Sequence, residues 1–206
     1  MIMKLTVLDM MKSKNILVLL LLLSSFCFSQ TKNEKEERIL QKNFPEKTSL
    51  SVALIKLKSK RILFYKETNN TKISFETKFK FNKHRYSIEF SENGTLEDVE
   101  KTLKKKEIKK LLKNDLNKIE TFFNKNYDKW SLKKVQKQYI FNAKTKQHIF
   151  INNILKNEED SAFNFEIIAE VKEKKSYSLK EFLFDNKGNH LSTKNIATSS
   201  YGHVLY

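Results

Sequence analysis

The sequence is poor in cysteine, proline and glycine, with one, one and three residues among 206. The single cysteine, Cys27, lies in an apolar N-terminal stretch, so disulfides within the chain, thiolate zinc sites and iron–sulfur ligation are excluded. Three glycines are too few for a glycine-rich loop that cradles phosphate. A chain with so few covalent or metal constraints must be stabilised by a sizeable apolar core.

Arginine is also scarce, because only Arg38, Arg61 and Arg85 are arginines among the 40 basic residues. The formal net charge is +16, but lysine mostly solvates a surface, whereas arginine is favoured for recognition of phosphates and bases. We therefore expect no nucleic-acid partner. The lysines predict a solvated surface, with an acidic partner or an anionic membrane as the alternatives.

The N-terminus has the pattern of a secretion signal. Lys12 and Lys14 precede the short apolar run of residues 16–23, and small residues follow it. This pattern predicts a signal peptide over residues 1–29, with the true start at Met11. The run is too short to span roughly 30 Å of hydrocarbon, so an uncleaved anchor is the weaker alternative.

Lipidation of Cys27 is not expected. Ser24 and Phe26 stand where a bacterial lipoprotein usually carries a leucine and a small residue. We therefore expect a periplasmic or secreted chain with no stable membrane span after removal of the signal.

Similar sequence blocks occur twice in the same order. The first pair is KNFPEKTSL (42–50) and KNYDKWSL (125–132), and the second is ISFETKFKFNKHRYSIEFSENGTL (73–96) and FNFEIIAEVKEKKSYSLKEFLFDNKGNHL (163–191). A biased composition explains one short match but not several in one order. This repetition predicts two units, residues 34–104 and 105–206.

Within these units the apolar pattern predicts helices followed by strands. Helical spacing of Ile39, Leu40 and Phe44 predicts a helix within residues 34–44, which Pro45 ends. A second helix is expected over residues 108–123, with a short extra helix near 145–155. Strict alternation over residues 73–81 and 85–90 predicts antiparallel strands. We expect an α+β fold of two tandem units, each a helix packed on a three- to four-stranded antiparallel sheet.

These blocks carry a family resemblance. The residues concerned are 42–45 and 86–100 in the first copy, and Lys125, Asn126, Tyr127, Tyr177 and Gly188 in the second. They resemble the exported PepSY-like proteins of Bacteroidetes-type bacteria, which are related to beta-lactamase-inhibitor-like domains. The resemblance implies tandem α+β units and binding or inhibition of other proteins, without an established enzymatic activity.

The polar residues give no recognisable catalytic or metal motif. His84, His148, His190 and His203 lack the spacing of a helical zinc site, and residues 158–160 lack the spacing of a calcium loop. We therefore predict no enzyme, no metal and no cofactor. The alternative is a small periplasmic hydrolase.

That hydrolase would combine Glu76 and Glu166, which occupy equivalent places in the two units, with a histidine. The simpler interpretation places both glutamates outward on strands, paired with lysines.

The predicted interaction site is the polar face of the first sheet. It comprises Glu76, Lys78, Lys80, Arg85 and Glu89, which alternate with buried aromatic residues. An open charged sheet face suits an envelope or secreted protein partner, in which opposed charges set specificity. The competing interpretation is that these residues only keep the sheet soluble. The sequence gives no indication of the oligomeric state.

Overall fold

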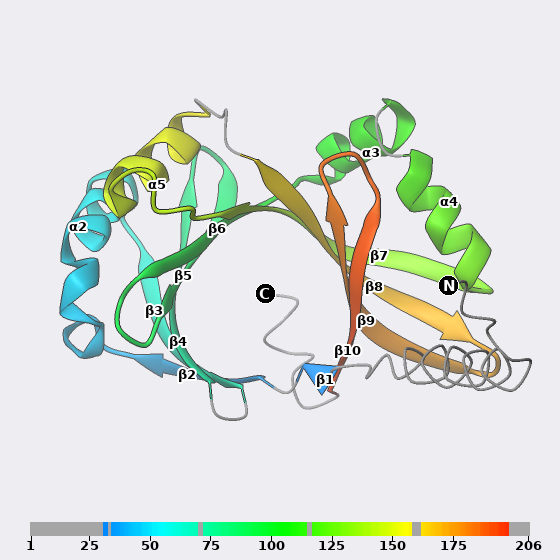
Figure 1. Cartoon of the computed structure of the whole chain (residues 1–206), viewed down its shortest axis with the longest axis horizontal. Helices are drawn as coiled ribbons and strands as arrows, with labels where there is room; N and C mark the ends of the chain where they lie inside the picture. Colours follow the sequence, from blue (N-terminus) through cyan, green and yellow to red (C-terminus); the bar gives the residue numbers. More distant parts are fainter. Residues whose placement is uncertain (1–30, 33, 70–71, 115–116, 158–161, 198–206) are drawn as a thin grey trace, which may run out of the picture. The chain divides into compact units, whose positions relative to one another are not determined.

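The computed structural model describes residues 31–32, 34–69, 72–114, 117–157 and 162–197 (Figure 1). The predicted signal peptide, residues 1–29, lies outside these residues, as does His203. Among the described residues, no helix combines the length and apolarity needed to cross a membrane.

The strands form one ten-stranded sheet, in the spatial order β1-β10-β9-β8-β7-β6-β5-β4-β3-β2. The strands are β1 (Thr31–Lys32), β2 (Glu34–Ile39), β3 (Ile62–Asn69), β4 (Lys72–Phe81), β5 (His84–Ser91), β6 (Leu96–Thr102), β7 (Lys129–Ile140), β8 (Phe163–Glu173), β9 (Ser176–Asp185) and β10 (His190–Ile196). Neighbours from β2 to β10 are antiparallel, as expected when consecutive strands pair. β1 pairs in parallel with β10, and β2 pairs with β3, so one segment of chain contacts both ends of the sheet.

The helices pack on one face of this sheet (Figure 1). They are α2 (Ser49–Lys58), α3 (Lys105–Asn114), α4 (Asn117–Asn126) and α5 (Gln147–Lys156), with two short 3-10 turns at Gln41–Asn43 and Glu46–Thr48. The sheet curves away from the helices. We call the face opposite the helices the inner face.

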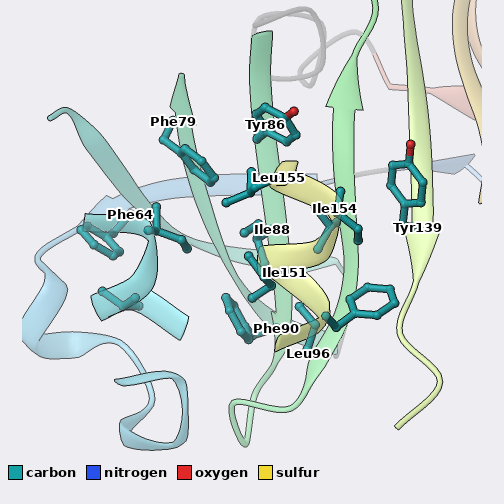
Figure 2. Packing of buried hydrophobic residues seen from close by; sticks show 14 of the residues in the cluster. Phe64, Phe79, Tyr86, Ile88, Phe90, Leu96, Tyr139, Ile151, Ile154 and Leu155 are labelled. Atoms are coloured by element: carbon teal, nitrogen blue, oxygen red, sulfur yellow. The ribbon is translucent and has the colours of Figure 1, made fainter. Parts of the chain in front are cut away.

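One hydrophobic cluster lies under α2 and α5. Figure 2 shows Ile151, Ile154 and Leu155 of α5 directed toward side chains of the sheet, among them Ile88 and Phe90. Burial of each such side chain stabilises the fold by roughly 1.5–3 kcal/mol. The strands of the first half of the chain therefore pack against two helices, α2 and α5, although α5 follows β7 in sequence.

A second cluster lies under α3 and α4. Phe123 of α4 is fully buried, and its ring centroid lies 4.8 Å from that of Phe182 on β9 and 5.1 Å from that of Trp130 on β7. Such edge-to-face and stacked pairs add to the stabilisation from burial alone. The prediction of helical structure over residues 108–123 is confirmed by α3 and α4, and α5 confirms the extra helix near 145–155.

The predicted fold of two tandem helix-and-sheet units is wrong. β6 and β7 pair along Asp98–Thr102 and Gln136–Ile140, so a single sheet continues across the expected boundary. Tyr139 of β7 belongs to the cluster under α2 and α5, which binds the second half of the chain to the core of the first. The repeated blocks also differ in structure, because Ser49 begins a helix whereas Ser131 lies within β7.

The helix expected to end at Pro45 is also wrong. Residues 34–39 form β2, and α2 begins after Pro45 rather than before it. Phe44 is buried, but Leu40, which shared the helical pattern, is 64% exposed. A short apolar pattern does not distinguish a helix from a strand, and here pairing with β3 decides the outcome.

Candidate functional site

The alternation of side chains along the strands produces a polar inner face. On β4, Phe75 and Phe79 pack in or against the cluster under α2 and α5, and the prediction of this alternation is confirmed. The intervening Glu76 and Lys78 therefore lie on the inner face. The same alternation in the neighbouring strands directs further charged side chains to this face, where the sheet curves around them.

These side chains line a cavity of about 290 Å³, to which every strand from β2 to β10 contributes. We call it the acidic cavity. Its carboxylates are Glu36, Glu67, Glu76, Glu89, Asp98, Glu100, Glu166 and Glu181, and its lysines are Lys72, Lys78, Lys134 and Lys194. Carboxylates therefore outnumber cations in the interior of a chain whose formal net charge is +16.

Lys78 neutralises one side of the acidic cavity. Its Nζ lies 2.9 Å from Glu36 Oε2 and 2.9 Å from Glu76 Oε2. Burial opposes ionisation of Glu76, but Lys78, a hydrogen bond shared with Glu67 and a hydrogen bond donated by Ser87 together outweigh burial and lower the pKa of Glu76. The pKa of Lys78 is raised by the two carboxylates against the opposing effect of burial.

The same region contains a group of oxygens with the spacing of a metal site. One carboxylate oxygen each from Glu36, Glu67 and Glu76 lies within 4.8 Å of the others. Oxygen ligands of this kind suit hard divalent cations. The Lys78 ammonium already contacts two of the three carboxylates, so it supplies positive charge where an ion would bind.

On the other side, three carboxyl groups are held with little compensation. Burial, assisted by Glu97 and Glu76, raises the pKa of Glu89 to about 7, although Ser74 and Lys72 act in the opposite direction. Lys72 Nζ is 3.8 Å from Glu89 Oε1 but only 2.7 Å from Glu97 Oε2.

Burial also raises the pKa of Asp98 and of Glu100 well above their ordinary values, and Glu166 adds to the effect at both. Their hydrogen-bond donors are neutral amides. Gln138 Nε2 donates to Asp98 Oδ2 at 3.0 Å, and Gln136 Nε2 donates to Glu100 Oε2 at 2.6 Å. This side of the acidic cavity can therefore gain from an additional positive charge.

A second cavity of about 610 Å³ adjoins the first, and we call it the adjoining cavity. The two share Glu36, Lys78, Ser87 and Lys134 as lining residues. The rest of the lining of the adjoining cavity includes apolar and aromatic side chains and four basic ones, namely Lys60, Arg61, Lys80 and Arg85. The inner face therefore changes from acidic to basic along the strands.

The residues predicted for the interaction site are divided between these two cavities. Glu76 and Glu89 line the acidic cavity, Lys80 and Arg85 line the adjoining cavity, and Lys78 lines both. They line a concave surface rather than a flat one, because the sheet curves around the inner face (Figure 1). Glu76 is 8% exposed, whereas Lys80 and Arg85 are exposed and directly opposite one another on β4 and β5.

The residues of the alternative hydrolase site are only partly brought together. Glu76 and Glu166 do line the same cavity, but the pKa of Glu76 is lowered rather than raised. None of the histidines in the described ranges lines either cavity. His84 Nε2 lies 3.0 Å from Glu107 Oε1, and the ring of His190 stacks on that of Phe122 at 4.4 Å.

Sequence reasoning missed several cavity residues. Those that line the acidic cavity without having been predicted include Glu36, Glu67, Asp98, Glu100 and Glu181. Glu36 was assigned to a helix, and its position on the inner face follows only from the pairing of β2 with β3. A signal was present in β6, where Asp98 and Glu100 alternate with buried Val99.

Comparison with protein-family models, curated proteins and solved structures found no match for the chain. The resemblance to PepSY-like proteins therefore stays a prediction. The geometry and charge of the two cavities are the basis for the functional proposal.

Proposed function

We propose that this protein is a non-catalytic, exported binding protein that holds a small organic cation in the acidic cavity. The observation that supports this function is the excess of carboxylates over lysines in the lining of a concave cavity of a strongly basic chain. A volume of about 290 Å³ is near the lower limit for small-molecule sites, so the bound group is compact. A periplasmic or secreted location is part of the same proposal.

An ammonium group fits the side of the cavity formed by Glu89, Asp98 and Glu100. Burial and neighbouring carboxylates hold these carboxyl groups at raised pKa values, although Lys72 at Glu89 and Lys134 at Glu100 act in the opposite direction. A cation placed among them favours the ionised forms and lowers their pKa values. An ammonium also brings several hydrogen-bond donors, which suit acceptors spread over separate strands.

The curvature of the sheet favours a small ligand over the protein partner that the sequence suggested. Ligand sites are concave, whereas a protein partner needs an accessible surface of roughly 800 Å² on each side. Glu76 is buried in the concave inner face, where a protein surface reaches it poorly. Binding of an envelope protein through these residues stays a prediction of the sequence.

Isothermal titration calorimetry with cadaverine tests the proposal. Pentanediol and glutarate serve as uncharged and anionic probes of the same chain length. We expect cadaverine alone to bind at pH 8. Asp98→Asn should weaken its binding at least about tenfold, the effect of losing one charge-assisted contact.

The matched control is Glu170→Gln, because Glu170 is 43% exposed in its side chain and pairs with Lys133 at 3.1 Å outside the cavity lining. Its affinity for cadaverine should equal that of the unmodified protein. Equal binding of cadaverine and pentanediol, or equal loss in both variants, would contradict the proposal.

A further inference from the structure

The adjoining cavity carries an excess of positive charge. Among the described residues, Lys60, Arg61, Lys80 and Arg85 make no ion pair, although all four line this cavity. Lys80 and Arg85 are also direct cross-strand neighbours, an arrangement in which like charges destabilise a sheet. An anionic group between them relieves this repulsion, and arginine binds carboxylate and phosphate oxygens in a bidentate manner.

A buried polar atom in the same cavity lacks a partner. Gln136 is 2% exposed and lines the adjoining cavity, and its Nε2 donates to Glu100. Its Oε1 has no hydrogen-bond partner in the described part of the chain. An unsatisfied buried acceptor is unfavourable by about 1–3 kcal/mol, so a hydrogen bond donated to this oxygen would stabilise the protein. This observation is independent of the charges.

Gln136 lies between the acidic and the basic regions of the inner face. Its amide contacts Glu100 of the acidic cavity, and it lines the adjoining cavity together with Arg85. Lys78 and Ser87 line both cavities, so the two volumes are neighbours along one face. A single ligand with one charged end in each cavity would pass Gln136.

We propose that the two cavities together bind a short zwitterionic peptide. The free ammonium lies in the acidic cavity, a peptide N–H donates to Gln136 Oε1, and the terminal carboxylate lies between Lys80 and Arg85. This inference rests on the proposed function, since it assigns the ammonium to the same acidic cavity. It adds the anionic group, the hydrogen-bond donor between the two charges and the residues that recognise each.

Three probes of one backbone separate the two claims. They are triglycine, triglycine amide, which lacks the carboxylate, and N-acetyl triglycine, which lacks the ammonium. Calorimetry at pH 8 should give the tightest binding for triglycine. Each blocked form should bind at least about tenfold more weakly, because each lacks one set of charge-assisted hydrogen bonds.

The double variant Lys80→Gln/Arg85→Gln tests the anionic subsite. Both side chains are exposed, so their replacement leaves the core intact. It should reduce the affinity for triglycine at least about tenfold and leave that for triglycine amide unchanged. Lys109→Gln, an exposed lysine of α3 outside both cavities, is the matched control and should bind triglycine normally.

The outcomes distinguish failure of the inference from failure of the proposed function. If triglycine and its amide bind equally, the anionic subsite is wrong and the cation site stands. If triglycine and its N-acetyl form bind equally, the peptide ammonium does not lie in the acidic cavity and the inference is wrong, whereas the cadaverine titration decides the proposed function. Absence of binding by all three probes, with cadaverine still bound, overturns the peptide and leaves the cation site.

Discussion

Replacement of Glu89 by glutamine is expected to stabilise the protein above pH 7. Burial and the neighbouring carboxylates raise the pKa of Glu89 to about 7, from an ordinary value of 4.5. The native state therefore binds a proton that the unfolded state releases. The contribution of Glu89 to the free energy of unfolding is therefore most stabilising below pH 4.5, where the side chain is protonated in both states. This stability is lost as the pH rises from 4.5 to 7.

The size of the effect follows from the pKa difference. Each pKa unit corresponds to about 1.4 kcal/mol, so ionised Glu89 disfavours the native state by roughly 3 kcal/mol above pH 7. Its side chain is 29% exposed, and water and the weak pairing with Lys72 reduce this to about 2 kcal/mol. Glutamine keeps the shape and removes the ionisation. Loss of the Glu89 charge also lowers the pKa of Asp98, which acts in the same direction.

Urea denaturation at pH 5 and at pH 8 measures this effect. Glu89→Gln should be nearly neutral at pH 5 and about 2 kcal/mol more stable than the unmodified protein at pH 8. The control is Glu170→Gln, with the same charge change on an exposed ion pair, which should stay within about 0.5 kcal/mol at both values. If Glu89→Gln is destabilising at pH 8, or its effect is the same at both pH values, the electrostatic description of the cavity is wrong.

Three further substitutions have expected outcomes in urea denaturation. Lys78→Gln removes the cation that pairs with the carboxylates of Glu36 and Glu76. It should destabilise the protein by about 3–5 kcal/mol at pH 8 and by less at pH 5, where protonation of the carboxylates offsets the loss. A destabilisation that does not depend on pH would contradict this reasoning. Phe123→Ala should cost about 3–5 kcal/mol because the side chain is fully buried, whereas Leu57→Ala, at a position 84% exposed, should stay within about 0.5 kcal/mol; similar costs would refute the assigned core. Gly94→Ala should cost more than about 1 kcal/mol, since φ is +77° and an added Cβ would lie 2.9 Å from Pro45 Cβ; a stabilising effect would show the turn to be wrong.

The sequence predicted local structure better than it predicted the sheet. Alternation in residues 73–81 placed Phe75 and Phe79 toward the core, because the period of a strand depends only on neighbouring residues. The continuity of the sheet depends on the pairing of β6 with β7, residues whose sequence separation includes two helices. Such long-range pairing leaves no local pattern, so the repeated blocks alone predict two separate sheets.

Only part of the lining of the acidic cavity could be predicted, because alternation along a strand is local whereas the pairing and curvature of the sheet are not. Glu76, Lys78 and Glu89 were identified because they alternate with aromatic residues on adjacent strands, and all three line the acidic cavity. The division of the predicted face between two cavities could not be predicted, since curvature is a property of the complete sheet. Glu36 could not be identified from the sequence, because its segment has an apparent helical period. Its contact with Lys78 also joins residues that are 42 positions apart in the chain.

Proton release on binding of cadaverine tests the central claim most directly. Calorimetry at pH 7 in two buffers of different ionisation enthalpy gives the number of protons exchanged. Because a bound cation lowers the raised pKa values of Glu89, Asp98 and Glu100, binding should release protons, and the affinity should increase from pH 6 to pH 8. Absence of binding, or binding without proton release and with the same affinity at both pH values, would contradict a cation site in the acidic cavity.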